Sequence, residues 1–291
     1  MDIILILISL YFFPLIVISA ASSFWLLMFR EWRLPLGELA DSAACPFRKA
    51  IQHDMGEMNR LAFRSFSDYC SVHIDSFAAS SPSIFIDIGS GDGRTTLLYL
   101  RRIFGSSKRI ILSDVVPNLD SWRQLAAIDA NVEFSTESRA GLDIFKFLDS
   151  EFRFDRKAIS LLNSLHHLSD ADFNKLVHEA SARGVWLFVM DVKRQSWFHP
   201  LLIPFVYWFF YVVLAWRGSG AEFHPDNYFR RIVLVIVEAW IMSFDQAVGS
   251  ARRFSLDSIL RCSSQNGFVN AVDQDWLMNY IIMIPRSGHE D

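Results

Sequence analysis

The stretch Ile84-Phe85-Ile86-Asp87-Ile88-Gly89-Ser90-Gly91-Asp92-Gly93 decides the fold of this chain. Its first half is a short run of branched and aromatic side chains, which is typical of a buried strand. Its second half holds three glycines, at which the backbone can turn sharply and approach a ligand closely because glycine has no Cβ. The residues that follow, 94–104, have the pattern of a helix. The stretch therefore predicts a strand, a ligand-binding turn and a helix in succession.

The same alternation continues along the chain. Strands are expected at 84–88, 109–113, 132–134, 158–162 and 185–190, with helices at 94–104, 119–128 and 170–182. Strands that alternate with helices at this spacing predict a parallel sheet with helices on both faces. A helix at 256–264 and strands at 267–269 and 276–284 follow, and their short connection favours an antiparallel pair. The predicted fold is a doubly wound, mostly parallel, Rossmann-like α/β sheet with an antiparallel C-terminal edge hairpin.

The composition argues against several classes of protein. A net charge of -4 lacks the basic field that nucleic-acid binding requires, so no nucleic-acid partner is expected. The three cysteines, Cys45, Cys70 and Cys262, are too far apart for a disulfide framework or a structural zinc site, and no metal is expected. The chain is 52% hydrophobic, with 26 Phe and 9 Trp, which is high for a soluble enzyme of 291 residues. Some of this apolar surface is therefore expected to face lipid.

The N-terminus has the pattern of a membrane anchor. Residues 3–29 carry no charge, and about 20 apolar residues are enough to cross the hydrocarbon core as a helix. Asp2 precedes the run and Arg30 and Arg33 follow it, so the positive-inside rule places the body of the protein in the cytosol. The alternative is a cleaved signal peptide, although the run is long for one and no basic residue precedes it. We expect residues 1–30 to form a single-pass transmembrane helix.

Two further segments accompany the predicted sheet domain of residues 83–291. Residues 31–82 are expected to form a helical extension or lid. Residues 197–245 interrupt the domain as an apolar insertion, with uncharged or nearly uncharged runs at 201–216 and 232–244. These runs fit a re-entrant or interfacial pair in contact with lipid, or two ordinary buried helices.

The spacing of the glycines separates two cofactor classes. The dinucleotide fingerprint G-x-G-x-x-G needs its third glycine at position 94, where this chain has Arg94. Gly93 comes one position too early. The loop is therefore of the nucleoside type rather than a pyrophosphate cradle, which disfavours a nicotinamide oxidoreductase.

The stretch from Asp87 to Gly93 resembles motif I of class I S-adenosylmethionine-dependent methyltransferases. The resemblance implies cofactor contacts by Asp87, Gly89, Ser90, Gly91 and Gly93. Asp114 ends the second predicted strand, where the family has an acid that accepts hydrogen bonds from the ribose hydroxyls. The alternative role for Asp114 is a helix or turn cap.

Residues 154–168 are similar to the family's fourth strand and the Asn or Ser and His pair that follow it. The similarity implies that Asn163 and His166 lie at the methionine end of the cofactor and the mouth of the substrate site. Glu137 is the nearest match to the family's adenine-contacting acid, after the third predicted strand. The resemblance thus implies S-adenosylmethionine as cofactor.

Methyl transfer requires the protein to orient the reactants and often to supply one general base. His166 and His167 are candidates, because histidine side chains titrate near neutral pH. Alternatively, one of them caps the next helix and the other packs. Asp191, at the end of the fifth predicted strand, is a third catalytic candidate, or else it forms a surface pair with Lys193 or Arg194.

The sequence as a whole predicts a membrane-anchored methyltransferase that acts on a small, lipophilic acceptor, with membrane lipid as a further partner. The alternative from another class is a catalytically silent S-adenosylmethionine-binding or scaffold protein with the same fold.

Overall fold

The computed structural model describes residues 82–105, 107–114, 117–134, 143–151, 156–193, 254–274 and 278–286, together with isolated positions at 13, 17, 212, 213, 232, 235 and 236. The continuous ranges form a sheet domain within a compact unit made of residues 55–193 and 253–291. The predicted anchor, the helical extension and the apolar insertion lie outside these ranges, apart from the isolated positions and residue 82. Within the part of the chain that is described, no helix is long and apolar enough to cross a bilayer.

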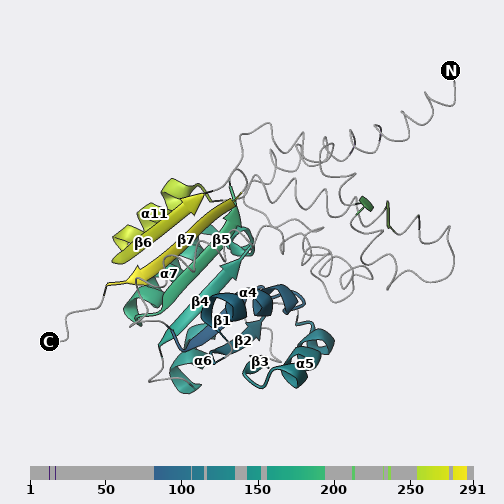
Figure 1. Ribbon diagram of the computed structural model, residues 1–291. Helices are drawn as coiled ribbons and strands as arrows, with labels where there is room; N and C mark the ends of the chain where they lie inside the picture. The colour runs from purple at the N-terminus through teal and green to yellow at the C-terminus, as the bar shows by residue number, and fades with distance from the viewer. Residues whose placement is uncertain are drawn as a thin grey trace. The chain divides into compact units, whose positions relative to one another are not determined.

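Seven strands form one sheet in the order β3-β2-β1-β4-β5-β7-β6 (Figure 1). The strands are β1 (Ile84–Ile88), β2 (Arg109–Ser113), β3 (Val132–Phe134), β4 (Lys157–Leu162), β5 (Trp186–Val192), β6 (Phe268–Gln274) and β7 (Met278–Pro285). Strands β1 to β5 pair in parallel, whereas β7 pairs antiparallel with both β5 and β6. The predicted sheet and its antiparallel C-terminal hairpin are confirmed. The structure adds that β7 lies between β5 and β6, so β6 forms the edge.

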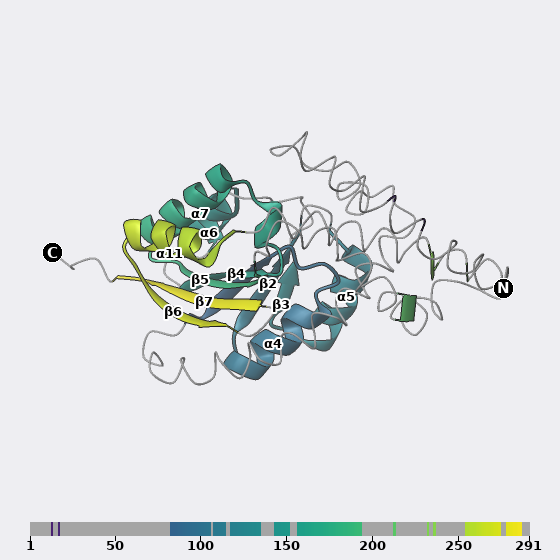
Figure 2. The same cartoon turned by 90° about the horizontal axis from the view of Figure 1, so that it is seen from above.

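Helices cover both faces of the sheet, as predicted (Figure 2). On one face lie α4 (Arg94–Phe104) and α5 (Leu119–Ile128), and on the other α6 (Asp143–Glu151), α7 (Asp170–Ala182) and α11 (Leu256–Gln265). A short 3-10 helix, η2 (Leu165–His167), follows β4. Helix α6, nine residues long, was not predicted.

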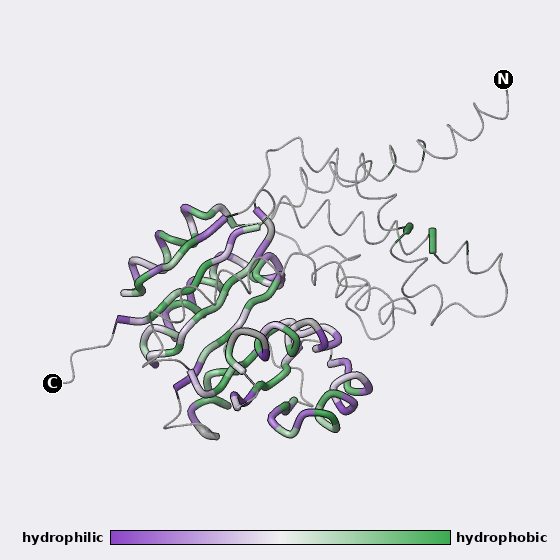
Figure 3. Tube along the Cα trace, in the orientation of Figure 1, coloured by the Kyte–Doolittle hydropathy of each residue, from purple (hydrophilic) through white to green (hydrophobic). Residues whose placement is uncertain are grey.

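The core consists of two apolar layers, one on each face of the sheet. In β1 all five side chains are buried, since a parallel sheet is covered on both sides. Ile84, Ile86 and Ile88 pack toward α6, α7 and α11. Phe85 packs in the opposite layer with residues of α4 and α5. This alternation follows from the two-residue period of a strand, and it places Asp87 on the α4 side of the sheet. The apolar strands stand out in Figure 3.

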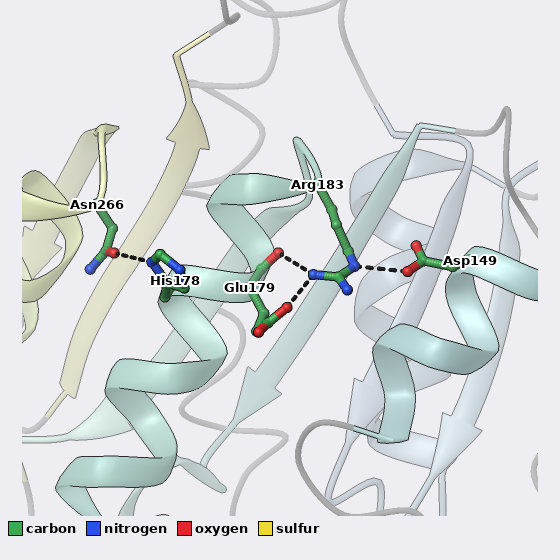
Figure 4. A network of polar contacts seen from close by, with 5 residues as sticks. All are labelled: Asp149, His178, Glu179, Arg183 and Asn266. Atoms are coloured by element: carbon green, nitrogen blue, oxygen red, sulfur yellow. Dashed lines mark hydrogen bonds and ion pairs between the residues drawn. The ribbon is translucent and has the colours of Figure 1, made fainter.

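A polar network joins the helices at the amino ends of the strands (Figure 4). Arg183, just before β5, donates to Asp149 Oδ2 at 2.8 Å and pairs with Glu179. His178 Nδ1 lies 3.2 Å from Asn266 Oδ1, just before β6. Exposed pairs of this kind contribute modestly to stability. The network ties α6, α7 and the turn after α11 together at the end of the sheet remote from the glycine loop.

Candidate active site

The strand order reverses between β1 and β4, and open α/β sheets bind ligands outside the carboxyl ends of the strands at such a point. The glycine loop follows β1 and Asp114 follows β2. Asn163 and the two histidines follow β4, and Asp191 is the next-to-last residue of β5. All predicted site residues that the structure describes therefore come from one edge of the sheet.

The three loop glycines have positive φ angles of 78°, 56° and 78° at Gly89, Gly91 and Gly93, a conformation that residues with a Cβ rarely adopt. A Cβ on Gly93 would lie 2.6 Å from Leu112 Cδ1, so packing demands glycine there. Among the described residues, no atom lies within 4 Å of the position that a Cβ on Gly91 would take. Gly91 therefore presents a bare backbone to open space, where a ligand can approach closely.

Backbone carbonyl oxygens accept hydrogen bonds from several of the loop amides. The N–H groups of Gly89 and Ser90 donate to the carbonyl oxygen of Ser113 at 2.9 and 3.1 Å. The N–H of Gly93 donates to the carbonyl oxygen of Ser90 at 2.8 Å. Ser113 N–H in turn donates to Ser90 Oγ at 3.1 Å. These bonds fasten the loop to the end of β2.

Carboxylate oxygens accept hydrogen bonds from two further amides. Gly91 N–H donates to Asp114 Oδ2 at 2.9 Å, and Arg94 N–H, at the start of α4, donates to Asp92 Oδ1 at 3.0 Å. The Asp92 side chain is buried with the loop, at 8% exposure of the residue. Asp114 therefore contacts the glycine loop directly. The sequence predicted both the loop and Asp114 as site residues, but their spacing could not show that they touch. One loop amide, that of Gly91, and the first amide of α4, that of Arg94, are therefore bonded to negative groups of the protein.

The first turn of α5 holds the other side of the loop. Trp122 Nε1 donates to the carbonyl oxygen of Gly91 at 3.1 Å, and Ser121 Oγ donates to that of Asp92 at 2.7 Å. The Trp122 residue is fully buried. Sequence reasoning did not single out either side chain, because a tryptophan on the apolar face of a helix reads as core. The Gly91 backbone is thereby bonded through both its N–H and its carbonyl oxygen.

Asp87, a predicted cofactor contact, is 1% exposed and lies against protein hydroxyls. Its Oδ2 accepts from Thr96 Oγ1 at 2.5 Å and its Oδ1 from Ser160 Oγ at 2.6 Å. Burial raises the pKa of Asp87 from 3.8 to about 6, against the opposing effect of these hydrogen bonds. Its carbonyl oxygen accepts from Ser90 Oγ at 2.9 Å. Asp87 therefore links the sheet, α4 and the glycine loop.

Two of the predicted catalytic residues form a pair. His166 Nδ1 lies 3.0 Å from Asp191 Oδ1, and the side chains are 9% and 4% exposed. The alternative interpretation of Asp191 as a surface residue is wrong, because Asp191 is buried at the end of β5, at 3% exposure. Arg194, one of the two partners considered for it, lies outside the described residues. A buried carboxylate that holds one ring nitrogen of a histidine orients the ring and leaves the other nitrogen for chemistry.

His167, the third catalytic candidate, is exposed, and its ring lies 4.2 Å from that of His166 between centroids. The alternative role of a histidine as helix cap is also wrong. Ser169 caps α7, and its Oγ accepts from Asp172 N–H at 3.1 Å. Neither histidine is therefore the N-cap of α7.

Asn163 has a positive φ of 55°, which asparagine tolerates better than most residues. Its N–H donates to the carbonyl oxygen of Met190 in β5 at 2.6 Å. The adjacent Ser164 Oγ donates to the carbonyl oxygen of Ile88 at 2.7 Å, next to the glycine loop. This turn joins the ends of β4, β5 and β1. Glu137 lies outside the described residues.

No family model and no curated protein sequence matches this chain. Solved structures resemble it. An O-methyltransferase family protein from Burkholderia thailandensis is 13% identical and superimposes with a TM-score of 0.51. The match covers 87% of this chain, which spans 63% of the length of that protein. A 1,6-didemethyltoxoflavin N1-methyltransferase of the same organism, solved with S-adenosylhomocysteine, is 13% identical over 77% of this chain and 79% of that one, with a TM-score of 0.43. The likeness to the first structure is one of fold. The domain shares the α/β fold of that O-methyltransferase family protein, as the motif resemblance predicted.

Proposed function

We propose that this protein is an S-adenosylmethionine-dependent methyltransferase that acts on a small acceptor. The observation that carries the proposal is the location of the His166–Asp191 pair at the same switch point as the glycine loop. The loop supplies a cofactor site, and the pair supplies a base beside it. Neither feature alone distinguishes an enzyme from a binding protein of the same fold.

The loop suits a nucleoside cofactor that carries a positive charge. Gly91 leaves room for close approach among the described residues, and the carboxylate of Asp114, which follows β2 and bonds to the loop, would accept hydrogen bonds from the ribose diol. Asp92 and Asp114 add negative charge around the loop, which favours a sulfonium over an anion. When bound, S-adenosylmethionine would supply an activated methyl group for in-line displacement.

The His166–Asp191 pair suits proton removal from the acceptor. With Nδ1–H donated to Asp191, Nε2 of His166 is the nitrogen that can take the proton of an acceptor hydroxyl as the oxygen gains its methyl group. Asp191 keeps the ring in this tautomer and stabilises the imidazolium that forms. The low exposure of both side chains limits competition from water.

His166→Gln and Asp191→Asn test the assignment. Calorimetry with S-adenosylhomocysteine measures binding, and turnover is followed with methyl-labelled cofactor and lipophilic extracts. We expect binding within about threefold of the wild type and turnover lower by about 10²- to 10⁴-fold. His178→Gln is the matched control, because His178 also uses Nδ1 in a side-chain hydrogen bond but lies at the amino ends of the strands. It should retain full turnover.

Three results separate the alternatives. Failure of the wild type to bind S-adenosylhomocysteine would remove the cofactor assignment. Binding without transfer to any acceptor would support a silent binding or scaffold protein. Transfer that survives His166→Gln undiminished would show that the reaction needs no base from this pair.

We further propose that the acceptor is lipophilic and that the protein acts at a membrane, with its sheet domain in the cytosol. This part rests on the sequence: the uncharged run 3–29 with its basic C-terminal flank, and the apolar runs within 197–245. Carbonate extraction of membranes should leave the full chain in the pellet and release a variant that lacks residues 1–30. Release of the full chain would count against the anchor.

A further inference from the structure

The glycine loop stands at a position where related α/β folds bind phosphate. A loop between a parallel strand and the start of a helix offers backbone amides and the positive end of the helix dipole. Here α4 is 11 residues long and begins directly after the loop. A phosphate-bearing nucleotide is therefore the natural competitor of any nucleoside cofactor at this site.

Five amides of the loop and the start of α4 already donate to acceptors within the protein. Those of Gly89, Ser90 and Gly93 donate to backbone carbonyls. Those of Gly91 and Arg94 donate to the carboxylates of Asp114 and Asp92, at 2.9 and 3.0 Å. A phosphate could gain these two amides only by displacing a carboxylate and would then lie beside its negative charge.

The loop is also held against rearrangement. Trp122 Nε1 fixes the Gly91 carbonyl oxygen at 3.1 Å, while Asp114 fixes the N–H of the same residue. Ser121 Oγ fixes the carbonyl oxygen of Asp92 at 2.7 Å. Turning the Gly91 amide toward a ligand would break at least one of these bonds. Close approach is therefore open at the Gly91 Cα, where a Cβ would meet no described residue within 4 Å, but not at the Gly91 amide.

We propose that Asp114 and Asp92 are specificity-determining residues that exclude phosphate-bearing nucleotides from the loop and so reserve the site for a phosphate-free nucleoside. The inference rests on the proposed cofactor site, but not on methyl transfer. It gives Asp114 a second role besides any contact with ribose: its charge and its bond to Gly91 occupy the anion position of the fold.

The test compares adenosine with ADP, which share the nucleoside and differ in the two phosphates. The measured quantity is the ratio of their dissociation constants, so a loss of ribose contact affects both ligands and cancels. The wild type should bind adenosine more tightly than ADP. Asp114→Asn keeps an oxygen acceptor for the Gly91 N–H but removes the charge, and it should shift the ratio toward ADP by about tenfold.

Asp92→Asn is the second variant and should shift the ratio in the same direction. Asp149→Asn is the matched control: it removes one carboxylate charge at the amino ends of the strands and should leave the ratio unchanged. Because the effect is electrostatic, the shift should shrink in about 1 M salt, where the Debye length is about 3 Å. Circular dichroism spectra confirm that each variant is folded.

Two results overturn the inference: a wild type that already prefers ADP, or an unchanged ratio in both variants. If S-adenosylhomocysteine binds the wild type while the ratio stays fixed, only the exclusion of anions is wrong. If the wild type binds neither S-adenosylhomocysteine nor adenosine, the proposed cofactor site fails with it.

Discussion

Gly93→Ala should destabilise the sheet domain without involving the ligand directly. The φ of 78° at this residue places the backbone in the left-handed region, which costs a residue with a Cβ about 1–2 kcal/mol. The new Cβ would also lie 2.6 Å from Leu112 Cδ1 and 3.0 Å from Leu125 Cδ1. Leu112 is fully buried and Leu125 is 9% exposed, so neither can yield freely. Overpacking of such a core adds about 1–3 kcal/mol, which gives a total of about 2–5 kcal/mol.

Gly105→Ala and Gly91→Ala separate the two contributions. Gly105 has a φ of 75° and Gly91 a φ of 56°, and in the part of the chain that the structure describes a Cβ at either would meet nothing within 4 Å. Each should therefore lose only the conformational part, about 1–2 kcal/mol. Gly91→Ala should in addition weaken S-adenosylhomocysteine binding by about tenfold or more, because its Cβ would occupy the open face of the loop. Gly105→Ala, at the end of α4, should bind normally.

Urea unfolding followed by circular dichroism gives the free energy of unfolding of each variant, and calorimetry gives the affinity. A Gly93→Ala variant no less stable than Gly105→Ala would refute the packing argument. Unchanged affinity in Gly91→Ala would refute the claim that a ligand approaches at that residue.

Three further predictions concern residues that support the site or lie away from it. Trp122→Phe keeps an aromatic ring but replaces the buried indole by a smaller phenyl and loses the N–H bonded to Gly91. We expect about 2 kcal/mol less stability and weaker S-adenosylhomocysteine binding in calorimetry, whereas Trp186→Phe should bind normally. Burial raises the pKa of Asp87 from 3.8 to about 6, so the stability due to its bound proton is complete only below the unfolded-state pKa of 3.8 and is lost as pH rises through 6. Asp87→Asn should therefore reduce the fall in unfolding free energy between pH 4 and 7 by about 2 kcal/mol, and an identical pH profile would contradict this. Arg183→Ala removes exposed ion pairs and should lower the free energy of unfolding in urea by about 1 kcal/mol. The affinity for S-adenosylhomocysteine should not change, and a loss of that affinity would contradict the separation of the two ends of the sheet.

The local elements of this fold could be read from the sequence. The predicted bounds of β1, α4, β2, α5, β3 and α7 agree with the structure, since each has a clear period or a clear turn at its ends. The glycine loop was recognisable because three glycines in five residues, between a strand and a helix, serve few other purposes. The parallel sheet followed from the alternation of these elements. The nine-residue helix α6 was not predicted from the sequence.

The sequence predicted which residues belong to the candidate site, but not how their side chains contact one another. The sequence placed His166 and Asp191 at the ends of two strands and left each a second, ordinary role. Their pairing across 25 residues depends on the register of β4 against β5 and on the turn at Asn163. Sequence patterns report the period of an element, whereas the register between elements is set by packing of the whole sheet.

The sequence by itself determined the order of strands and helices and the residues at the carboxyl edge, because periodicity and turn chemistry are local properties of the chain. Only the tertiary structure decided what these residues touch. It turned Asp87 toward Thr96 and Ser160, placed Asp114 on the Gly91 amide, and inserted β7 between β5 and β6. Each of these arrangements joins different strands, helices or loops, and it forms only when the layers of the domain pack together.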